Sequence, residues 1–177
     1  MRLFVALDLP SRVRTALADW ADAAAPPVVR RVAPDNLHVT LAFLGSRDED
    51  DALVVGRLLS ARARKLARLQ TAGALWLPPR RPGVLTVALL ADDGLSALQA
   101  DLVAVLRSAI GLEPEARPFR PHITVGRVPR WTRIATRDAL RAPAPALTFR
   151  APAVTLFRSH TSAGGARYEP LARAVLP

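Results

Sequence analysis

The sequence contains no cysteine, which excludes disulfide bridges, cysteine nucleophiles, and zinc or iron–sulfur sites built on thiolates. Long apolar runs are also missing, because none reaches the roughly 18 residues that a membrane-spanning helix needs. The apolar N-terminal stretch ends at Asp8 and is too short for a signal peptide. We therefore expect a strand over Arg2–Leu9 and a cytoplasmic protein that has no contact with a membrane.

The chain has 177 residues, half of them apolar, so a sizeable core can form and a disordered chain is excluded. This length predicts a single domain over residues 1–177. Lys65 is the only lysine, so arginine supplies nearly all of the basic charge, and the net charge is +10. A positive field of this size favours a polyanionic partner such as RNA, although an arginine- and alanine-rich chain equally indicates a GC-rich coding sequence.

Hydrophobic spacing predicts a mixture of helices and strands. Ser11 is the predicted N-cap of a first helix, the acidic run Asp48–Asp51 suits the start of a second, and Asp92 or Asp93 caps a third. A weaker helical pattern covers Thr132–Ala142. The predicted strands are a pair over Val28–Val32 and Leu37–Leu44, then Ala72–Leu77, Val84–Leu90, Phe119–Val128, and a hairpin over Val154–Ser159 and Arg167–Val175. Because several connections have hairpin length, this order favours an α+β fold with antiparallel sheets over a parallel doubly wound sheet.

Two segments resemble each other and lie about half the chain apart. Asn36–Gly45 contains His38-Val-Thr40-Leu, and Phe119–Arg127 contains His122-Ile-Thr124-Val. The chain has three histidines, so two copies by chance are expected in fewer than about one case in a thousand. Copies spaced in this way indicate an internal duplication.

Strand geometry explains the motif, since side chains alternate between the two faces of a strand. His38 and Thr40 share one face, and His122 and Thr124 do the same in the second copy. A neutral imidazole can take a proton from water, an imidazolium can protonate a leaving oxygen, and threonine hydroxyls can donate to phosphate oxygens. The pattern therefore predicts phosphodiester chemistry without a metal ion or cofactor. Phe43 shares its parity with Leu41, so we expect it in the core. His160 lacks the motif and is expected to be a structural or surface residue.

At these residues the chain resembles the 2H phosphoesterase superfamily, and more closely the RNA 2′,3′-cyclic phosphodiesterases, also called 2′-5′ RNA ligases. Similar segments are Arg2–Ala6, Asn36–Gly45, Pro79–Pro82, Arg117–Arg127 and Tyr168–Leu171. The resemblance implies two pseudo-symmetric lobes, each an antiparallel sheet with helices on its outer face, and an active-site cleft between them. It also implies hydrolysis of a 2′,3′-cyclic phosphate to a 2′-phosphomonoester.

The resemblance further implies roles for individual residues. It assigns His38 as the acid and His122 as the base, and the pseudo-symmetry leaves the reverse assignment open. Arg127 is expected to contact the phosphate, although strict alternation points it away from His122 unless the strand bends near Gly126. Where relatives often carry an aromatic residue before the first motif, this chain has Arg30-Arg31.

Three functions remain open at this point. The first is hydrolysis of RNA ends or of cyclic nucleotides that carry a 2′,3′-cyclic phosphate, by a monomer. The second is a 2H enzyme acting on another phosphodiester, such as a 2′-5′ linkage or a cyclic ADP-ribose phosphate. The third is a non-catalytic RNA-binding module, against which stands the duplicated histidine, because arginines alone would suffice for binding.

Overall fold

The computed structural model describes residues 1–66, 68–79, 81–90, 93–129, 132, 140, 142–162 and 165–177. The described helices are α1 (Ser11–Ala24), α2 (Glu49–Arg62), α3 (Asp93–Ile110) and the short 3-10 helix η1 (Pro34–Asn36). The strands are β1 (Arg2–Asp8), β2 (Arg30–Arg31), β3 (His38–Ser46), β4 (Leu69–Leu77), β5 (Val84–Leu89), β6 (His122–Arg127), β7 (Thr148–Phe149), β8 (Ala153–Ser162) and β9 (Gly165–Val175). None of these helices is long and apolar enough to cross a membrane.

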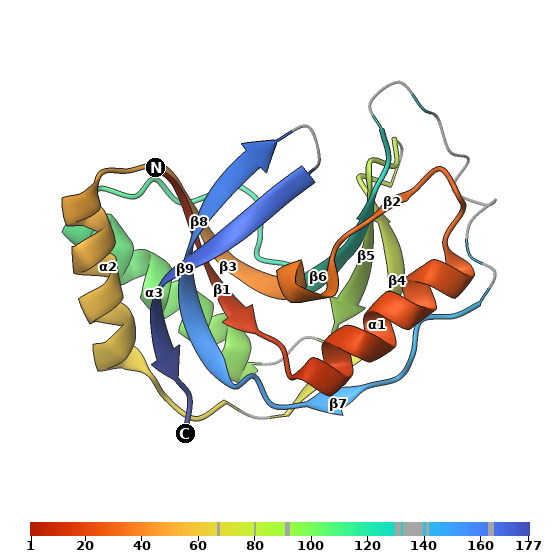
Figure 1. The fold of residues 1–177 in the computed structure, drawn as a ribbon. Coiled ribbons are helices and arrows are strands. Elements are labelled where there is room, and N and C mark those ends of the chain that lie inside the picture. The colour runs from red at the N-terminus through yellow and green to blue at the C-terminus, as the bar shows by residue number, and fades with distance from the viewer. Residues whose placement is uncertain are drawn as a thin grey trace.

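The strands form one antiparallel sheet in the order β7-β4-β5-β6-β3-β1-β8-β9, with β2 also paired to β6. Its two halves meet where β3 lies beside β6, and Val39 is opposite Ile123 at this junction. Figure 1 shows the β8–β9 hairpin rising on one side of the junction and β4 and β5 on the other. The expected α+β fold with antiparallel sheets and two lobes is confirmed.

The helices exchange sides between the halves. Helix α1 follows β1 but contacts β2 and β6, whereas α3 follows β5 but contacts β3 (Figure 1). Helix α2 packs against α3 and against β8 and β9. Each half of the sheet is therefore covered by a helix whose preceding strand belongs to the other half.

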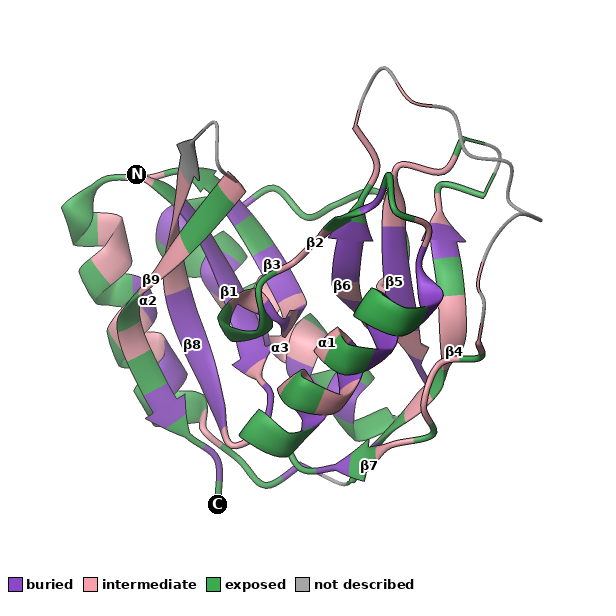
Figure 2. Cartoon of the chain, turned by 45° about the vertical axis from the view of Figure 1, so that its right-hand side comes forward, coloured by how far each residue is buried: buried purple, intermediate pink, exposed green. Residues whose placement is uncertain are grey.

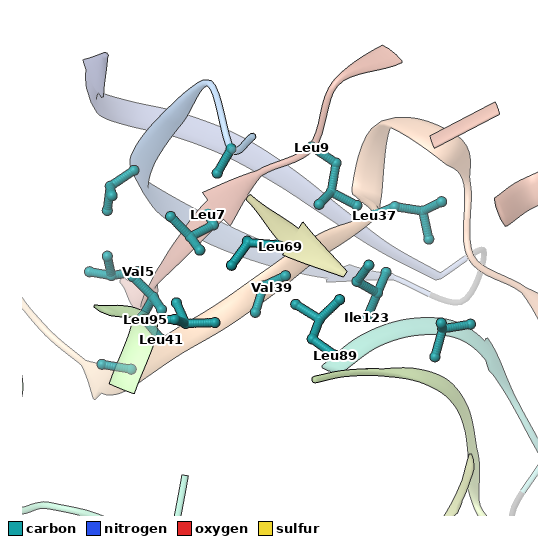
Figure 3. Close-up of a cluster of buried hydrophobic side chains, with 14 of the residues drawn as sticks. Val5, Leu7, Leu9, Leu37, Val39, Leu41, Leu69, Leu89, Leu95 and Ile123 are labelled. Atoms are coloured by element: carbon teal, nitrogen blue, oxygen red, sulfur yellow. The ribbon is translucent and has the colours of Figure 1, made fainter. Parts of the chain in front are cut away.

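One apolar cluster joins the helices to the sheet. Figure 2 shows buried residues along β1, β8, β6 and β5, and Figure 3 shows Val39 and Ile123 among leucines from several strands and from α3. Val39 and Ile123 are both fully buried in this cluster. The junction between the halves is thus also the centre of the core, and burial of apolar surface there stabilises the pairing of β3 with β6.

Sequence patterns located most of the elements. The acidic run begins α2 as predicted, with Asp48 as the N-cap residue whose side chain accepts a hydrogen bond from the Asp51 amide. Gly111 follows α3 with a φ of 61°, the left-handed conformation that glycine favours at helix ends. The predicted hairpin near the C-terminus is formed by β8 and β9.

Two local predictions are wrong, and a third lies outside the described residues. Ser11 is not the N-cap: Pro10 holds that position, because α1 already begins at Ser11. The segment Val28–Val32 does not pair with Leu37–Leu44, because η1 turns the chain between them and β2 lies against β6 instead. The predicted helix over Thr132–Ala142 falls mostly on residues that the structure does not describe.

Gly126 allows β2 to approach β6 closely. A Cβ atom at this position would lie 2.5 Å from the Val29 side chain, and Leu85 lies on the same side. Both neighbours belong to the core, which leaves a side chain at position 126 no room.

We expect Gly126→Ala to destabilise the protein by roughly 1–3 kcal/mol, the usual cost of overpacking. Gly83→Ala is the matched control, because the nearest atom to its Cβ would be 3.8 Å away. Urea unfolding of both variants measures the difference. Equal midpoints for the wild type and Gly126→Ala would contradict the close approach of β2 to β6.

Candidate active site

The register of β3 and β6 brings the two motifs together. Val39 pairs with Ile123 in antiparallel register, and both side chains enter the core. The residues on either side of them therefore face the opposite way, with His38 across from Thr124 and Thr40 across from His122. These four residues form one group on the polar face of the sheet, which we call the His–Thr quartet.

Both histidines are held by the same kind of hydrogen bond, from Nδ1 to the backbone carbonyl two residues earlier. His38 Nδ1 lies 2.7 Å from the Asn36 carbonyl oxygen, and His122 Nδ1 lies 2.7 Å from the Arg120 carbonyl oxygen. A carbonyl only accepts, so each Nδ1 carries the proton and donates it. The other nitrogen, Nε2, is then the one available for proton transfer in each ring. In His38 it lies 3.1 Å from the Thr40 hydroxyl oxygen.

Each motif strand also carries a β-bulge at the same place, three residues after its histidine. Leu41 has no partner where β3 pairs with β1, and Val125 has none where β6 pairs with β5. Their carbonyls are bonded elsewhere, Leu41 to the Gln99 side chain and Val125 to the Val32 amide. A bulge adds one residue to a strand, so the alternation of side chains reverses beyond it.

The two bulges explain where Phe43 and Arg127 lie, each five residues after a motif histidine. Phe43 is 60% exposed, and its ring centroid is 6.3 Å from that of Phe4. The prediction of a core position for Phe43 is therefore wrong, because the bulge at Leu41 reverses its direction. Arg127 is exposed, and Gly126 before it faces Val29 in the core. The expected bend thus occurs at Val125, and it turns Arg127 toward the face of the quartet.

The two histidines have different surroundings. His38 lies among aromatic rings, with ring centroids 4.9 Å away in Phe4, 5.3 Å in Tyr168 and 6.3 Å in Phe157. These rings come from β1, β9 and β8, and the sequence pattern did not indicate that they would meet at His38. The register of β1, β8 and β9 brings these rings together, and that register is defined only in the assembled sheet.

Burial lowers the pKa of His38 to about 4. The hydrogen bond to Asn36 opposes this effect, the electrostatic effects of Arg127 and His122 add to it, and Asp8 opposes it. His38 is therefore neutral at neutral pH, with Nε2 unprotonated and able to accept a hydrogen bond from the Thr40 hydroxyl.

Other residues considered from the sequence lie outside the quartet. His160 Nε2 is hydrogen-bonded to Glu169 Oε2 at 2.7 Å, and this hydrogen bond lowers the pKa of the Glu169 carboxyl. Strand alternation places Glu169 on the face of β9 opposite to Tyr168, and therefore away from His38.

Arg31 donates to the carbonyls of Ala25 and Val29, so its guanidinium holds the end of α1. Among the described residues, no group of three or more histidine and acidic side chains is arranged to hold a metal ion.

The sheet, the exchanged helices and the two symmetrically placed His-x-Thr motifs define a 2H phosphoesterase fold. Residues 7–163 match the family model described as the 2′-5′ RNA ligase superfamily. The chain belongs to this family and, like its named relatives, is an enzyme.

Individual relatives are similar over most or nearly all of the chain. The RNA 2′,3′-cyclic phosphodiesterase of Escherichia coli K12 is 34% identical and covers 99% of this chain and 96% of its own length. That of Thermus thermophilus is also 34% identical, over 72% of this chain and 68% of its own. Among solved structures, E. coli LigT complexed with 3′-AMP gives a TM-score of 0.76 at 32% identity, covering 99% of this chain and 97% of that one.

The electrostatics of His38 are directly measurable. We expect its imidazole to titrate near pH 4 in a histidine NMR titration. Arg127→Gln should raise this pKa, because it removes a nearby positive charge, and saturating inorganic phosphate should raise it as well. Arg117→Gln, an exposed arginine replaced in the same way, is the control and should leave it unchanged. A His38 that titrates at its ordinary value of 6.5 in the wild type would contradict the effect of burial.

Proposed function

We propose that the protein hydrolyses 2′,3′-cyclic phosphate ends of RNA to 2′-phosphomonoesters, with His38 and His122 as general acid and base. The observation that carries the proposal is the His–Thr quartet. Its two imidazoles both carry their proton on Nδ1, and they lie on either side of the Val39–Ile123 pair. Support also comes from the E. coli and T. thermophilus relatives, whose names state this activity. The histidines can supply both proton transfers, so the mechanism that we propose needs no metal ion.

The reaction balances with these two groups. His122 Nε2 takes a proton from a water molecule whose oxygen attacks phosphorus. The bond between phosphorus and the 3′ oxygen breaks, and His38 Nε2 gives a proton to that oxygen. The products are a 2′-phosphomonoester and a free 3′-hydroxyl, and each histidine has changed its protonation state. Exchange of protons with solvent restores both.

The threonines and Arg127 hold the non-bridging oxygens, on which negative charge increases in the transition state. In the free protein the Thr40 hydroxyl faces Nε2 of neutral His38. When this nitrogen is protonated it no longer accepts a hydrogen bond, so the Thr40 hydroxyl is free to donate to phosphate. Thr124 has the equivalent position two residues after His122, across from His38, and Arg127 adds a positive charge to the same face.

An acid role for His38 requires its imidazolium form while substrate is bound. Its low pKa in the free protein results first from burial and then from the charges of Arg127 and His122. A bound phosphodiester brings a negative charge and pairs with Arg127, and both effects raise the pKa. The substrate thus promotes the protonation that its own cleavage needs.

Phe43 and Arg127 suggest how a nucleotide is oriented. The two positions are equivalent in the duplicated motif, yet one supplies an exposed aromatic ring and the other a cation. We propose that Arg127 binds the phosphate and that Phe43, beside Phe4, stacks on a nucleobase. The complex of LigT with 3′-AMP is consistent with nucleotide recognition in this family.

The alternatives predict different outcomes. A 2H enzyme specific for another phosphodiester would cleave a 2′-5′ linkage or a cyclic ADP-ribose phosphate faster than a 2′,3′-cyclic end. A binding module would retain RNA without turnover. The matching hydrogen bonds of the two histidines favour catalysis over binding, because a pure binding site has no need to fix the tautomer of both rings.

The deciding assay uses an oligonucleotide that ends in a 2′,3′-cyclic phosphate, in excess chelator, followed by mapping of the oxygen that keeps the phosphate. We expect a 2′-phosphate as product. His38→Ala and His122→Ala should each lower the rate by about 100-fold or more, as loss of an acid or base does. His160→Ala is the matched control and should retain activity. Dependence on a divalent ion, or equal loss in all three variants, would reject the mechanism.

The proposed roles of Phe43 and Arg127 can be separated. Phe43→Ala should raise KM for a cyclic mononucleotide about tenfold, the loss expected for one stacking contact. It should leave inhibition by inorganic phosphate unchanged. Arg127→Gln should weaken phosphate inhibition and cyclic nucleotide binding together. If Phe43→Ala weakens inhibition by inorganic phosphate as strongly as Arg127→Gln does, the division of roles is wrong.

A further inference from the structure

Asp8 lies beside His38 at the end of β1. The two residues are paired in the antiparallel register of β1 and β3, next to the pair of Leu7 and Val39. Leu7 and Val39 both enter the core, so Asp8 and His38 share the opposite face. The Asp8 side chain is 17% exposed, which is low for a carboxylate.

The contacts of Asp8 are unequal at its two oxygens. Oδ2 accepts a hydrogen bond from Arg173 Nε at 2.9 Å. Oδ1 is buried and has no hydrogen-bond partner among the described residues. Arg173 comes from β9, where it is paired with Thr155 of β8, and its side chain is 48% exposed. Water therefore screens the charge of Arg173 more effectively than that of Asp8.

The groups that face His38 make this carboxylate significant. Strand β6 contributes the cation Arg127 and the imidazole of His122, β9 contributes Tyr168, and η1 contributes the Asn36 carbonyl. Phe4 of β1 and Phe157 of β8 add uncharged rings to this environment. Burial and the electrostatic effects of Arg127 and His122 thus disfavour a proton on His38, while Asp8 favours one.

We propose that Asp8 is a positioning residue that holds a negative charge beside His38 and so stabilises the imidazolium form during the reaction. This inference rests on the proposed function of His38 as a proton donor. Asp8 acts through its charge and not through a hydrogen bond, since both ring nitrogens of His38 have other partners. Arg173 keeps the carboxylate in place. A buried carboxylate oxygen without a hydrogen bond costs stability, and such costs persist where they serve a site.

The first test is an NMR titration of His38 in the free protein, which does not depend on activity. Asp8→Asn, nearly the same in shape, removes the charge and should lower the pKa of His38 further below about 4. Arg173→Gln removes the cation but keeps the carboxylate, so it should raise this pKa. Asp101→Asn, another ion-paired carboxylate, lies on α3 and is the control. Opposite shifts in the Asp8 and Arg173 variants support the proposal. If Asp8→Asn does not fold, a rise in Arg173→Gln supports it alone, and no rise overturns it.

The second test is the pH dependence of cyclic phosphate hydrolysis. Asp8→Asn should lower kcat/KM about three- to tenfold at pH 7, because a lower pKa leaves less imidazolium. Acidification should restore most of this loss, whereas a purely structural defect would persist at every pH. An unchanged His38 pKa in Asp8→Asn would overturn the inference even if the wild type is active. A wild type without hydrolysis would instead reject the proposed function and leave the titration result standing.

Discussion

The contact between β3 and β6 at Val39 and Ile123 determines the geometry of the site. These residues are the paired positions of two duplicated strands, and both are fully buried at the centre of the core. Their pairing fixes His38 opposite Thr124 and Thr40 opposite His122. The exchange of α1 and α3 between the halves covers this junction with helices from both parts of the chain. The positions of the quartet side chains on the polar face of the sheet thus depend on apolar packing on the opposite face.

The two copies of the motif resemble each other more in backbone conformation than in their side chains. Both motifs carry a carbonyl that fixes the imidazole, a threonine two residues after the histidine, and a bulge at the third residue. Beyond the bulges the copies differ, because Phe43 is an aromatic ring and Arg127 is a cation. A symmetric frame therefore presents an asymmetric surface, which suits a nucleotide that has an aromatic base at one end and an anionic phosphate at the other.

The electrostatic environment of His38 controls its protonation. His38 is surrounded by rings and buried, which holds its pKa near 4, and Arg127 and His122 act in the same direction. Asp8 and a bound phosphodiester act in the opposite direction. In the proposed mechanism, the protonation of His38 is controlled by whether the anion is bound, and the neutral form keeps the Thr40 hydroxyl bonded to the ring. Groups contributed by two neighbouring strands, β1 and β6, thus control the protonation of the imidazole on β3.

The sequence alone determined the α+β class, the start of α2, the C-terminal hairpin and the faces of His38, Thr40, His122 and Thr124, because each follows from local periodicity or capping. It could not determine which strands pair, so β2 was assigned to the wrong neighbour. The same limit placed Phe43 in the core, since a bulge reverses alternation and appears only when two strands are in register. Tertiary structure alone brought Asp8, Phe4 and Tyr168 to His38, because their contacts join segments far apart in the chain.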